Sequence, residues 1–323
     1  MNEPPLSRVG IGTPSEWRQR PERGSRTLLR MMAFVSLRLG RPAGRVVLYV
    51  IASYFFLFAP AARRRMRDYL RRALGREPRA AERFRLVMNF ATTIHDRLYL
   101  LAGRYDLFKI TIQGEPLIRE VVANRTGAFL MGAHMGSFEV LRAIGARQAG
   151  LSVTMVMYEE NARKLNAILA AAAPKDPPQI IALGRLDAML QIQQRMDQGE
   201  LVGVLADRMM GEEPSLPVTF LGATVYLPTG PMRAAAVLRR RAVFMLGLYR
   251  GGNHYHAVFD DLADFSAIPP GQTKAAIEAA ITRYAALLEH YCRTDPYNWF
   301  NFYDFWRTNA ASPAHPMPQP PRE

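Results

Sequence analysis

Apolar residues follow two different spacings along most of this 323-residue chain. Short apolar or alternating runs predict strands at 106–114, 128–134, 151–159, 178–184, 200–207, 242–252 and 254–265. Segments with apolar residues at helical spacing predict helices at 115–127, 137–150, 162–173, 186–199, 228–241 and 272–294. Because the two kinds of segment alternate, we expect an α/β fold with a layered, mixed and largely parallel sheet flanked by helices.

The N-terminal part has a different pattern. It predicts helices at 26–40, 43–74 and 80–103, and it contains the uncharged apolar run 46–62. The 17 positions of that run are at the short end of what crosses a hydrocarbon core of about 30 Å. The run starts too late for a secretory signal peptide and lacks a cleavage pattern. A short membrane span, a helix lying in the plane of the lipid headgroups and a buried core helix all fit it.

Positive charge is concentrated in the same region. Of the formal net charge of +14, residues 1–85 supply an excess of 13, with 19 arginines against six acidic residues. Arg41 and Arg45 precede the apolar run, and six arginines follow it within ten residues. Such a segment suits either nucleic acid or an anionic lipid surface, and the apolar residues between the arginines favour the lipid. We therefore expect contact with an anionic membrane surface and no nucleic acid.

The stretch "FLMGAHMGSFEVLRAIG" joins an apolar run to a helical run through a Gly-rich loop that holds His134. We expect Ser137 to cap the helix and Glu139 to fall in its first turn. Five positions along a continuous helix would place His134 and Glu139 about 140° apart, so the two can meet only if the chain bends. Gly136 permits that bend. A carboxylate on one ring nitrogen would fix the tautomer and leave the other nitrogen free to accept a proton.

Other polar residues follow strands in the same way. Asp207 and Arg208 come directly after the strand-like run "VLAD", and another loop follows "MVMYE". Because ligands bind where the strands of such a sheet end, we expect one pocket to collect these loops and His134. Free amides at the start of the helix after Gly136 suit a developing negative charge or a phosphate.

No nucleophile accompanies the histidine. The chain has no Gly-x-Ser-x-Gly motif, and its single cysteine, Cys292, lies in a distant predicted helix and excludes a disulfide framework. The pattern fits direct attack by an acceptor hydroxyl on an activated acyl carbonyl, although a hydrogen-bonded structural histidine fits the spacing equally well. Two other groups are weaker candidates. His95 and Asp96 fit a polar helix position, and the pair in "HYH" at 254–256 lacks a nearby third metal ligand.

The segment "AHMGSFE" resembles the His-x4-acid motif of the glycerolipid-type acyltransferases, most closely the lipid A lauroyl/myristoyl acyltransferase family. The resemblance covers roughly residues 15–310. It includes the basic apolar N-terminus and, after the histidine motif, an arginine, a helix ending in Gly, a strand ending in Asp and a Thr/Gly-led helix of small residues. The aromatic segment "PYNWFNFYDFWR" stands where the family has a Trp-containing closing segment.

The resemblance implies transfer of a fatty-acyl or polyene-acyl group from an acyl carrier protein or coenzyme A thioester to a hydroxyl of a lipid-like acceptor, without a covalent acyl-enzyme. It implies that His134 is the general base and that Glu139 orients it. Arg185 would hold a phosphate or the oxyanion, and Asp207 would orient a partner such as Arg208. Gly136 and Ser137 would contribute to the binding of substrate or oxyanion. No metal and no cofactor are expected.

The chain also departs from the lipid A enzymes. "SFE" stands where they commonly have a Trp at the middle position, "ADRMMGEE" replaces an Asp-rich run, and the C-terminal segment is more aromatic. These features resemble the acyltransferases found with aryl-polyene pigment synthesis, so the acceptor is open. Two other functions remain alternatives. One is a non-catalytic, membrane-anchored lipid- or acyl-binding module, and the other is a thioester hydrolase that uses the same pair of residues with water.

These patterns divide the chain into four parts. We expect a flexible basic arm at 1–25, membrane-associating helices at 26–80, an α/β acyltransferase domain at 81–311 and a disordered Pro-rich tail at 312–323. The resemblance implies attachment to the bacterial inner membrane, with the catalytic domain on its cytoplasmic face.

Overall fold

The structure is a computed structural model that describes residues 26–145, 152–158, 179–184, 187–209, 213–269 and 271–306. Four of the sequence expectations lie outside the described residues: the arm at 1–25, the helix at 162–173, Arg185 and the tail at 312–323. The division into domains therefore stays a prediction.

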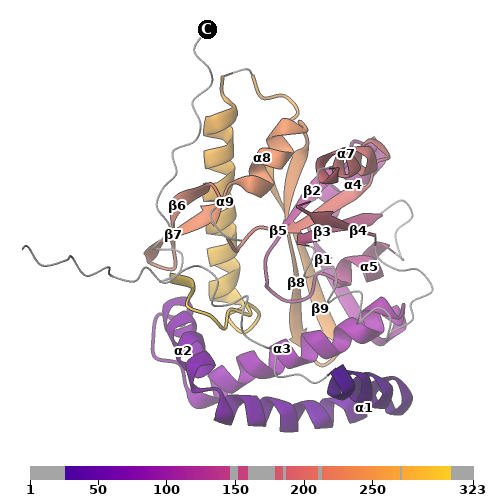
Figure 1. Cartoon of the computed structure of the whole chain (residues 1–323), viewed down its shortest axis with the longest axis vertical. Coiled ribbons are helices and arrows are strands. Elements are labelled where there is room, and N and C mark those ends of the chain that lie inside the picture. Colours follow the sequence, from indigo (N-terminus) through magenta and orange to yellow (C-terminus); the bar gives the residue numbers. More distant parts are fainter. Residues whose placement is uncertain are drawn as a thin grey trace, which may run out of the picture.

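A seven-stranded sheet lies at the centre of the molecule (Figure 1). In spatial order its strands are β1 (Lys109–Gln113), β9 (His254–Asp264), β8 (Arg241–Gly251), β2 (Ala128–Gly132), β5 (Leu201–Leu205), β3 (Val153–Tyr158) and β4 (Ile180–Leu183). All neighbouring strands are parallel except β8 and β9, which pair antiparallel. The predicted mixed, largely parallel sheet is confirmed.

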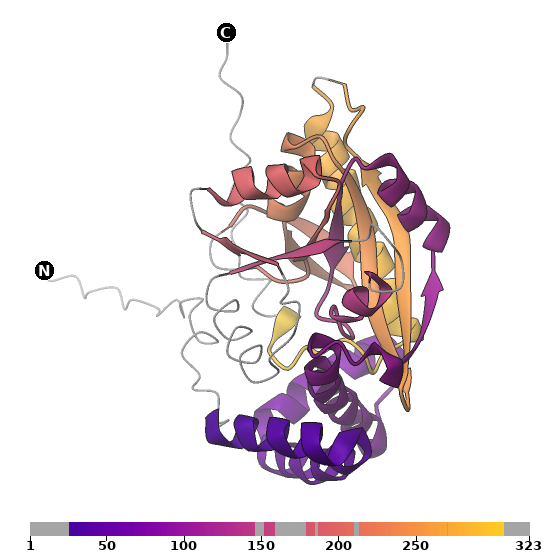
Figure 2. The ribbon, with the colours of Figure 1, turned by 90° about the vertical axis from the view of Figure 1, so that its right-hand side faces the viewer.

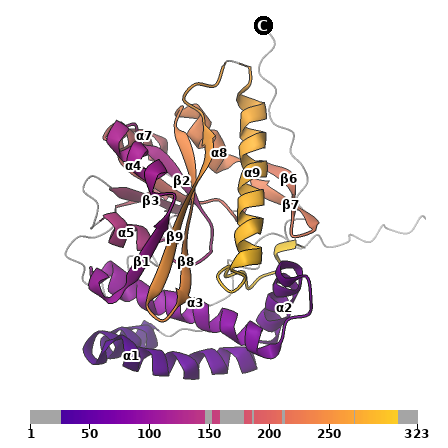
Figure 3. The same cartoon turned by 180° about the vertical axis from the view of Figure 1, so that it is seen from behind.

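Helices cover both faces of the sheet (Figures 1 and 3). One face carries α7 (Ala188–Asp197), α8 (Gly230–Val237) and α9 (Thr273–Thr294), and the other carries α4 (Glu115–Asn124) and α5 (Val140–Gly145). Along β2, Phe129 and Met131 join the first core, whereas Ala128 and Leu130 join the second. This double burial explains why the strand is apolar at every position instead of alternating.

A small antiparallel hairpin was missed at the sequence level. It consists of β6 (Ser215–Phe220) and β7 (Ala223–Pro228), joined by Leu221 and Gly222. Both linking residues have positive φ, 49° and 78°, as a type I′ hairpin turn requires. Leucine rarely adopts this conformation, and Pro217 lies inside β6, so neither the turn nor the strand has its usual sequence signal.

Three N-terminal helices form a layer across one end of the sheet (Figures 1 and 2). They are α1 (Arg26–Phe58), α2 (Pro60–Leu74) and α3 (Ala80–Leu101), and the short 3-10 helix Tyr105–Leu107 leads from α3 to β1. The helix predicted at 43–74 is interrupted at Ala59, because Pro60 starts α2 at its first position. A kink at Gly40, where φ is 80°, divides α1.

The side chain of Asp96 joins this layer to the sheet. It is fully buried on α3, accepts two hydrogen bonds of 2.6 and 2.7 Å from Arg41 of α1, and accepts a third of 2.9 Å from the Tyr255 hydroxyl of β9. Burial alone would raise the pKa of Asp96, but the Arg41 guanidinium and the other donors hold it below the ordinary 3.8. Asp96 thus has a structural environment, in line with the helix position expected for it.

Candidate active site

The loop that carries His134 is clamped between β8 and the C-terminal segment. Gly136 has a φ of 70°, and a Cβ atom there would overlap the carbonyl oxygen of Gly247 on β8. That oxygen accepts a 2.8 Å hydrogen bond from the amide of Ser137. On the other side, the amide of Phe300 donates to the His134 carbonyl at 2.9 Å. The predicted bend at Gly136 is therefore present, and contacts on both sides hold it in place.

His134 and Asp207 meet because of the register of two parallel strands. β2 and β5 are neighbours in which Gly132 pairs with Leu205, and each strand is followed two residues later by a site residue. The His134 Nδ1 atom lies 2.8 Å from Asp207 Oδ1, and the His134 amide donates to Asp207 Oδ2 at 3.1 Å. The backbone and the ring of His134 are thus both held by one carboxylate.

Asp207 is completely buried and is held by several donors. The indole Nε1 of Trp299, also fully buried, donates to Asp207 Oδ2 at 3.1 Å. Burial alone would raise the pKa of Asp207, but the neighbouring His134, Arg208 and Trp299 lower it well below the ordinary 3.8. Asp207 is therefore ionised near neutral pH and favours a proton on His134 Nδ1.

Glu139 is not the carboxylate that contacts the His134 ring, so the orienting role that the sequence predicts for it is wrong. Its carboxylate, 3% exposed, forms an ion pair of 2.7 Å with Arg97 Nε of α3 and accepts a 3.0 Å hydrogen bond from the Ser137 hydroxyl. The predicted helix start also differs, because α5 begins at Val140 and Ser137 and Glu139 precede it. The turn at Gly136 explains both differences. It directs the Ser137 amide to the Gly247 carbonyl of β8, and Asp207 is then the carboxylate that lies beside the His134 ring.

His134 keeps one ring nitrogen available. Its side chain is 33% exposed, and among the described residues no hydrogen-bond partner reaches Nε2. Burial, with the nearby charges of Arg208 and Arg97, lowers the pKa of His134 from the ordinary 6.5, although Asp207 opposes the shift. The ring is therefore neutral at pH 7, with a proton on Nδ1 and a lone pair on Nε2, which is the state a general base needs.

Arg208 directly follows Asp207 in the sequence and brings a positive charge close to the histidine–aspartate pair. Its Nη2 donates to the Phe300 carbonyl at 2.9 Å, and its guanidinium carbon lies 5.2 Å from the centre of the Tyr303 ring. Its Nε atom is buried without a hydrogen-bond partner among the described residues. A buried donor without a partner costs free energy unless something accepts from it, so Arg208 suits an anionic group of a substrate.

The family described as bacterial lipid A biosynthesis acyltransferase matches residues 21–308. The chain belongs to this family. A search of curated proteins finds no significant match. The resemblance inferred from the sequence is thereby confirmed, and the family supports acyltransferase activity on lipid A-like substrates.

In this member of the family, the aromatic C-terminal segment is part of the core. Trp299 packs edge-to-face on Tyr69 of α2, with 4.9 Å between ring centres, and on Phe220 of β6 at 5.4 Å. The Tyr249 amide donates a 2.8 Å hydrogen bond to Asn298 Oδ1. The sequence suggested a cover over the acyl chain or core for this segment, and for Trp299 and Phe305 the structure shows core.

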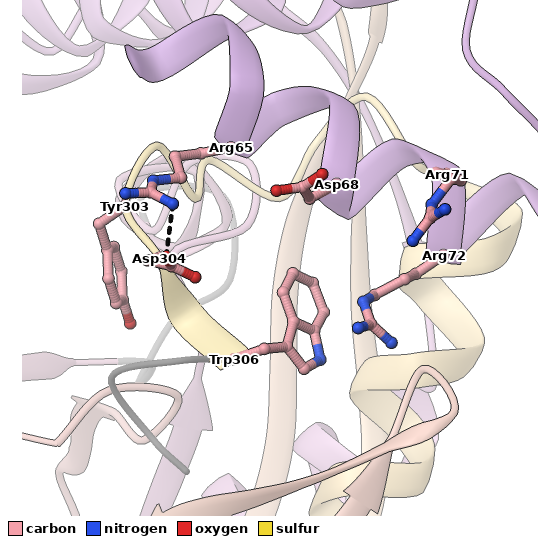
Figure 4. Close-up of a pocket in the computed structure, with 7 residues that line it drawn as sticks. All are labelled: Arg65, Asp68, Arg71, Arg72, Tyr303, Asp304 and Trp306. Atoms are coloured by element: carbon pink, nitrogen blue, oxygen red, sulfur yellow. Dashed lines mark hydrogen bonds and ion pairs between the residues drawn. The ribbon is translucent and has the colours of Figure 1, made fainter. Parts of the chain in front are cut away.

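A cavity of about 300 Å³ opens beside this segment (Figure 4). Its lining consists of Arg65, Asp68, Arg71 and Arg72 from α2 and Tyr303, Asp304 and Trp306 from the C-terminal segment. Arg65 and Asp304 form an ion pair, and the Arg72 guanidinium lies 4.7 Å from the Trp306 ring centre. Tyr303 lies between this cavity and the site, because its ring also lies against Arg208.

His254 and His256 point toward the same hydroxyl group. Thr111 Oγ1 of β1 lies 3.0 Å from His254 Nε2 and 2.9 Å from His256 Nδ1. In the part of the chain that the structure describes, no third metal-ligating side chain joins them. Both rings of β9 therefore have Thr111 of the neighbouring strand β1 as a structural partner.

Proposed function

We propose that the protein transfers an acyl group from a thioester to a hydroxyl of a lipid A-like acceptor, with His134 as the general base. The observation that carries the proposal is the pairing of His134 Nδ1 with the buried, ionised Asp207, which leaves Nε2 free. A neutral histidine held in one tautomer by a carboxylate is suited to take a proton from an attacking hydroxyl.

The proposed reaction is one acyl transfer. His134 Nε2 accepts the proton of the acceptor hydroxyl as its oxygen bonds to the thioester carbonyl carbon. Arg208 stabilises the negative charge that develops on the carbonyl oxygen. The carbon–sulfur bond then breaks, and the departing sulfur takes the proton from His134. The products are an ester and a free thiol, without an acyl group on the protein.

Glu139 has a supporting role in this scheme. It neutralises Arg97 and fixes the Ser137 hydroxyl, so it holds the loop in which His134 lies. We assign the orientation of the ring to Asp207 and the positioning of the loop to Glu139. Trp299, by donating to Asp207, keeps that carboxylate aligned with the ring.

For the donor, we propose an acyl carrier protein or coenzyme A thioester. Both carry phosphate on the arm that ends in the thiol. The cavity beside Tyr303 is lined by three arginines, Arg65, Arg71 and Arg72, against two carboxylates, Asp68 and Asp304, so its net positive charge complements such a phosphate. The acceptor is a lipid-like hydroxyl, with a lipid A precursor and an aryl-polyene product as the two candidates. We place the enzyme at the inner face of the bacterial inner membrane.

Replacement of His134 by Ala tests this function. We expect acyl transfer, followed with a radiolabelled acyl thioester and a lipid A precursor, to fall by about 10²–10⁴-fold. Unchanged circular dichroism would show that the variant folds. Retained turnover would rule out His134 as the base. Release of free fatty acid at the full rate without an acceptor would favour a hydrolase, and thioester binding without any product would favour a binding module.

A further inference from the structure

The second half of α1, residues 41–58, has two different faces. The residues that pack inward recur every three or four positions, at Arg41, Arg45, Leu48, Ala52 and Phe56. The rest of the surface is apolar and faces solvent. The exposed fractions lie between 40% and 70% for Val46, Val47, Tyr49, Val50, Tyr54, Phe55, Leu57 and Phe58. Among the residues from 38 onward whose side-chain exposure the structure describes, only three other large apolar side chains are comparably exposed, so the exposed apolar residues are concentrated in this patch.

This half of α1 is attached to α3 near both of its ends. Close to its start, Arg41 forms the buried ion pair with Asp96 and also donates to the Gly252 carbonyl in the β8–β9 turn at 2.6 Å. Close to its end, the Phe56 ring meets the Phe84 ring of α3 edge-to-face, with 5.6 Å between ring centres. Asp96 and Phe84 lie toward opposite ends of α3, so α1 runs antiparallel along it (Figure 1).

These attachments decide how α1 can meet a membrane. Among the described residues, Gly40–Phe58 is the one helix long and apolar enough to cross a bilayer. Its 19 residues would span about 28 Å if the helix stood upright. An upright α1 would carry α3 into the hydrocarbon with it, including the side chains of Arg83, Arg85 and Arg97. Each charge at that depth costs about 2.5–3.5 kcal/mol or more, so the docked helix does not cross.

The charge around the patch identifies what covers it. Arg64 and Arg67 are exposed in the first half of α2, which begins two residues after α1 ends, and Arg67 also pairs with Glu77. Residues 1–85 carry an excess of 13 positive charges. An apolar helix face beside exposed arginines is the pattern of a helix lying at an anionic lipid surface, where the side chains enter the acyl boundary and the arginines meet phosphates.

We propose that residues 41–58 of α1 lie parallel to an anionic bilayer, with Val46, Val50, Tyr54, Leu57 and Phe58 in the lipid and α3 on the side away from it. Arg97 of α3 binds Glu139 beside the His134 loop, so two packed helices, α1 and α3, lie between the lipid and the loop. The orientation holds whether or not His134 is the base, because it rests on the contacts of α1 and the charges near it and not on the histidine site.

A charge scan of matched positions tests the surface. Val50 is 70% exposed on α1, and Val237 is 74% exposed on α8. In cosedimentation of the full chain with vesicles of phosphatidylglycerol and phosphatidylcholine, we expect Val50→Glu to weaken binding at least about tenfold. Val237→Glu should change it less than about twofold, and thermal melting should be unchanged in both. Equal binding by Val50→Glu and the parent protein would overturn the proposal, as would equal loss in Val237→Glu.

Depth measurements distinguish a parallel helix from a crossing one. The native Cys292 is fully buried, so a fluorophore can be attached to single cysteines introduced at Val46, Val50 or Leu57 of the folded protein. Val50 and Leu57 share one face and lie about 10 Å apart along the axis. We expect brominated lipids to quench all three probes from the same shallow depth. A depth difference approaching 10 Å between Val50 and Leu57 would show a crossing helix. Probes shielded from lipid in a dimer would show that a second copy covers the face.

Discussion

Two buried carboxylates near His134 are held in different ways. Asp207, at the end of β5, contacts His134 through the ring and the amide and accepts a third hydrogen bond from Trp299. Glu139, just before α5, is bound instead by the permanent cation of Arg97 and by Ser137. The first carboxylate is therefore coupled to a group that titrates near neutral pH, and the second is not. Strand register, more than separation in sequence, selects the partner of the histidine ring.

The largest effect should come from Asp207→Asn. This change keeps the size of the side chain, but it removes the charge that favours the Nδ1 tautomer and stabilises the imidazolium. We expect kcat/KM for acyl transfer to fall by about 10²–10⁴-fold, nearly as far as in His134→Ala. Steady-state kinetics with an acyl thioester donor measure it. If Asp207→Asn keeps most of the activity while Glu139→Gln loses it, the roles of the two carboxylates are reversed.

A second test removes the bend between the two regions. Gly136→Ala would force a Cβ atom into the Gly247 carbonyl at a φ of 70°. Gly75, after α2, has a similar φ of 67° but no atom within 4 Å of the added Cβ, so Gly75→Ala is a matched control. We expect Gly75→Ala to cost about 1 kcal/mol of unfolding free energy from backbone strain alone. Gly136→Ala should cost about 1–3 kcal/mol more.

Chemical denaturation of both variants measures this difference. Activity per folded molecule should fall only in Gly136→Ala, since that change displaces His134 relative to Asp207. Equal unfolding free energies in the two variants would mean that the loop relaxes freely and that the Gly247 contact does not fix His134.

Much of this site was accessible from the sequence. The apolar runs before His134 and Asp207 predict two parallel strands, and the expectation that polar loops gather at strand ends brings both residues to one pocket. The Gly136 bend was also predicted, and the positive φ confirms it. What the sequence could not supply is the order of strands in space. Only when β2 and β5 are neighbours in register does Asp207 lie beside the ring, so spacing in the sequence favours the nearer acidic residue, Glu139, as the partner. The contribution of Trp299 depends on packing between segments more than 90 residues apart.

The third test addresses Glu139 itself. Glu139→Gln keeps an acceptor for Ser137 but leaves the Arg97 charge uncompensated. Because the Arg97 side chain is 30% exposed, water offsets part of that loss. We expect kcat/KM to fall by less than about tenfold, equivalent to about 1.4 kcal/mol of transition-state free energy. Arg97→Gln combined with Glu139→Gln should recover part of the lost activity, and the absence of any recovery would separate Glu139 from Arg97.

The smallest expected effect is a shift in pH dependence. Burial and the Arg208 charge lower the pKa of His134 below 6.5, so kcat/KM should rise with pH to a plateau whose midpoint lies below 6.5. The pKa of His134 is lower in the folded protein than in the unfolded chain. The contribution of His134 to the free energy of unfolding is therefore full above pH 6.5 and is lost as the pH falls from 6.5 through the folded pKa.

Arg208→Gln removes a cation that opposes protonation of His134, so the midpoint of the pH profile should move upward by less than about one unit. Because Arg208 also stabilises the oxyanion in the proposed reaction, the plateau itself should be lower in Arg208→Gln, by the same factor at every pH. A rate profile between pH 4.5 and 8 separates the two effects. A midpoint that stays fixed in Arg208→Gln but moves in Glu139→Gln would show that the Glu139 region, and not the Asp207 region, controls the charge on His134.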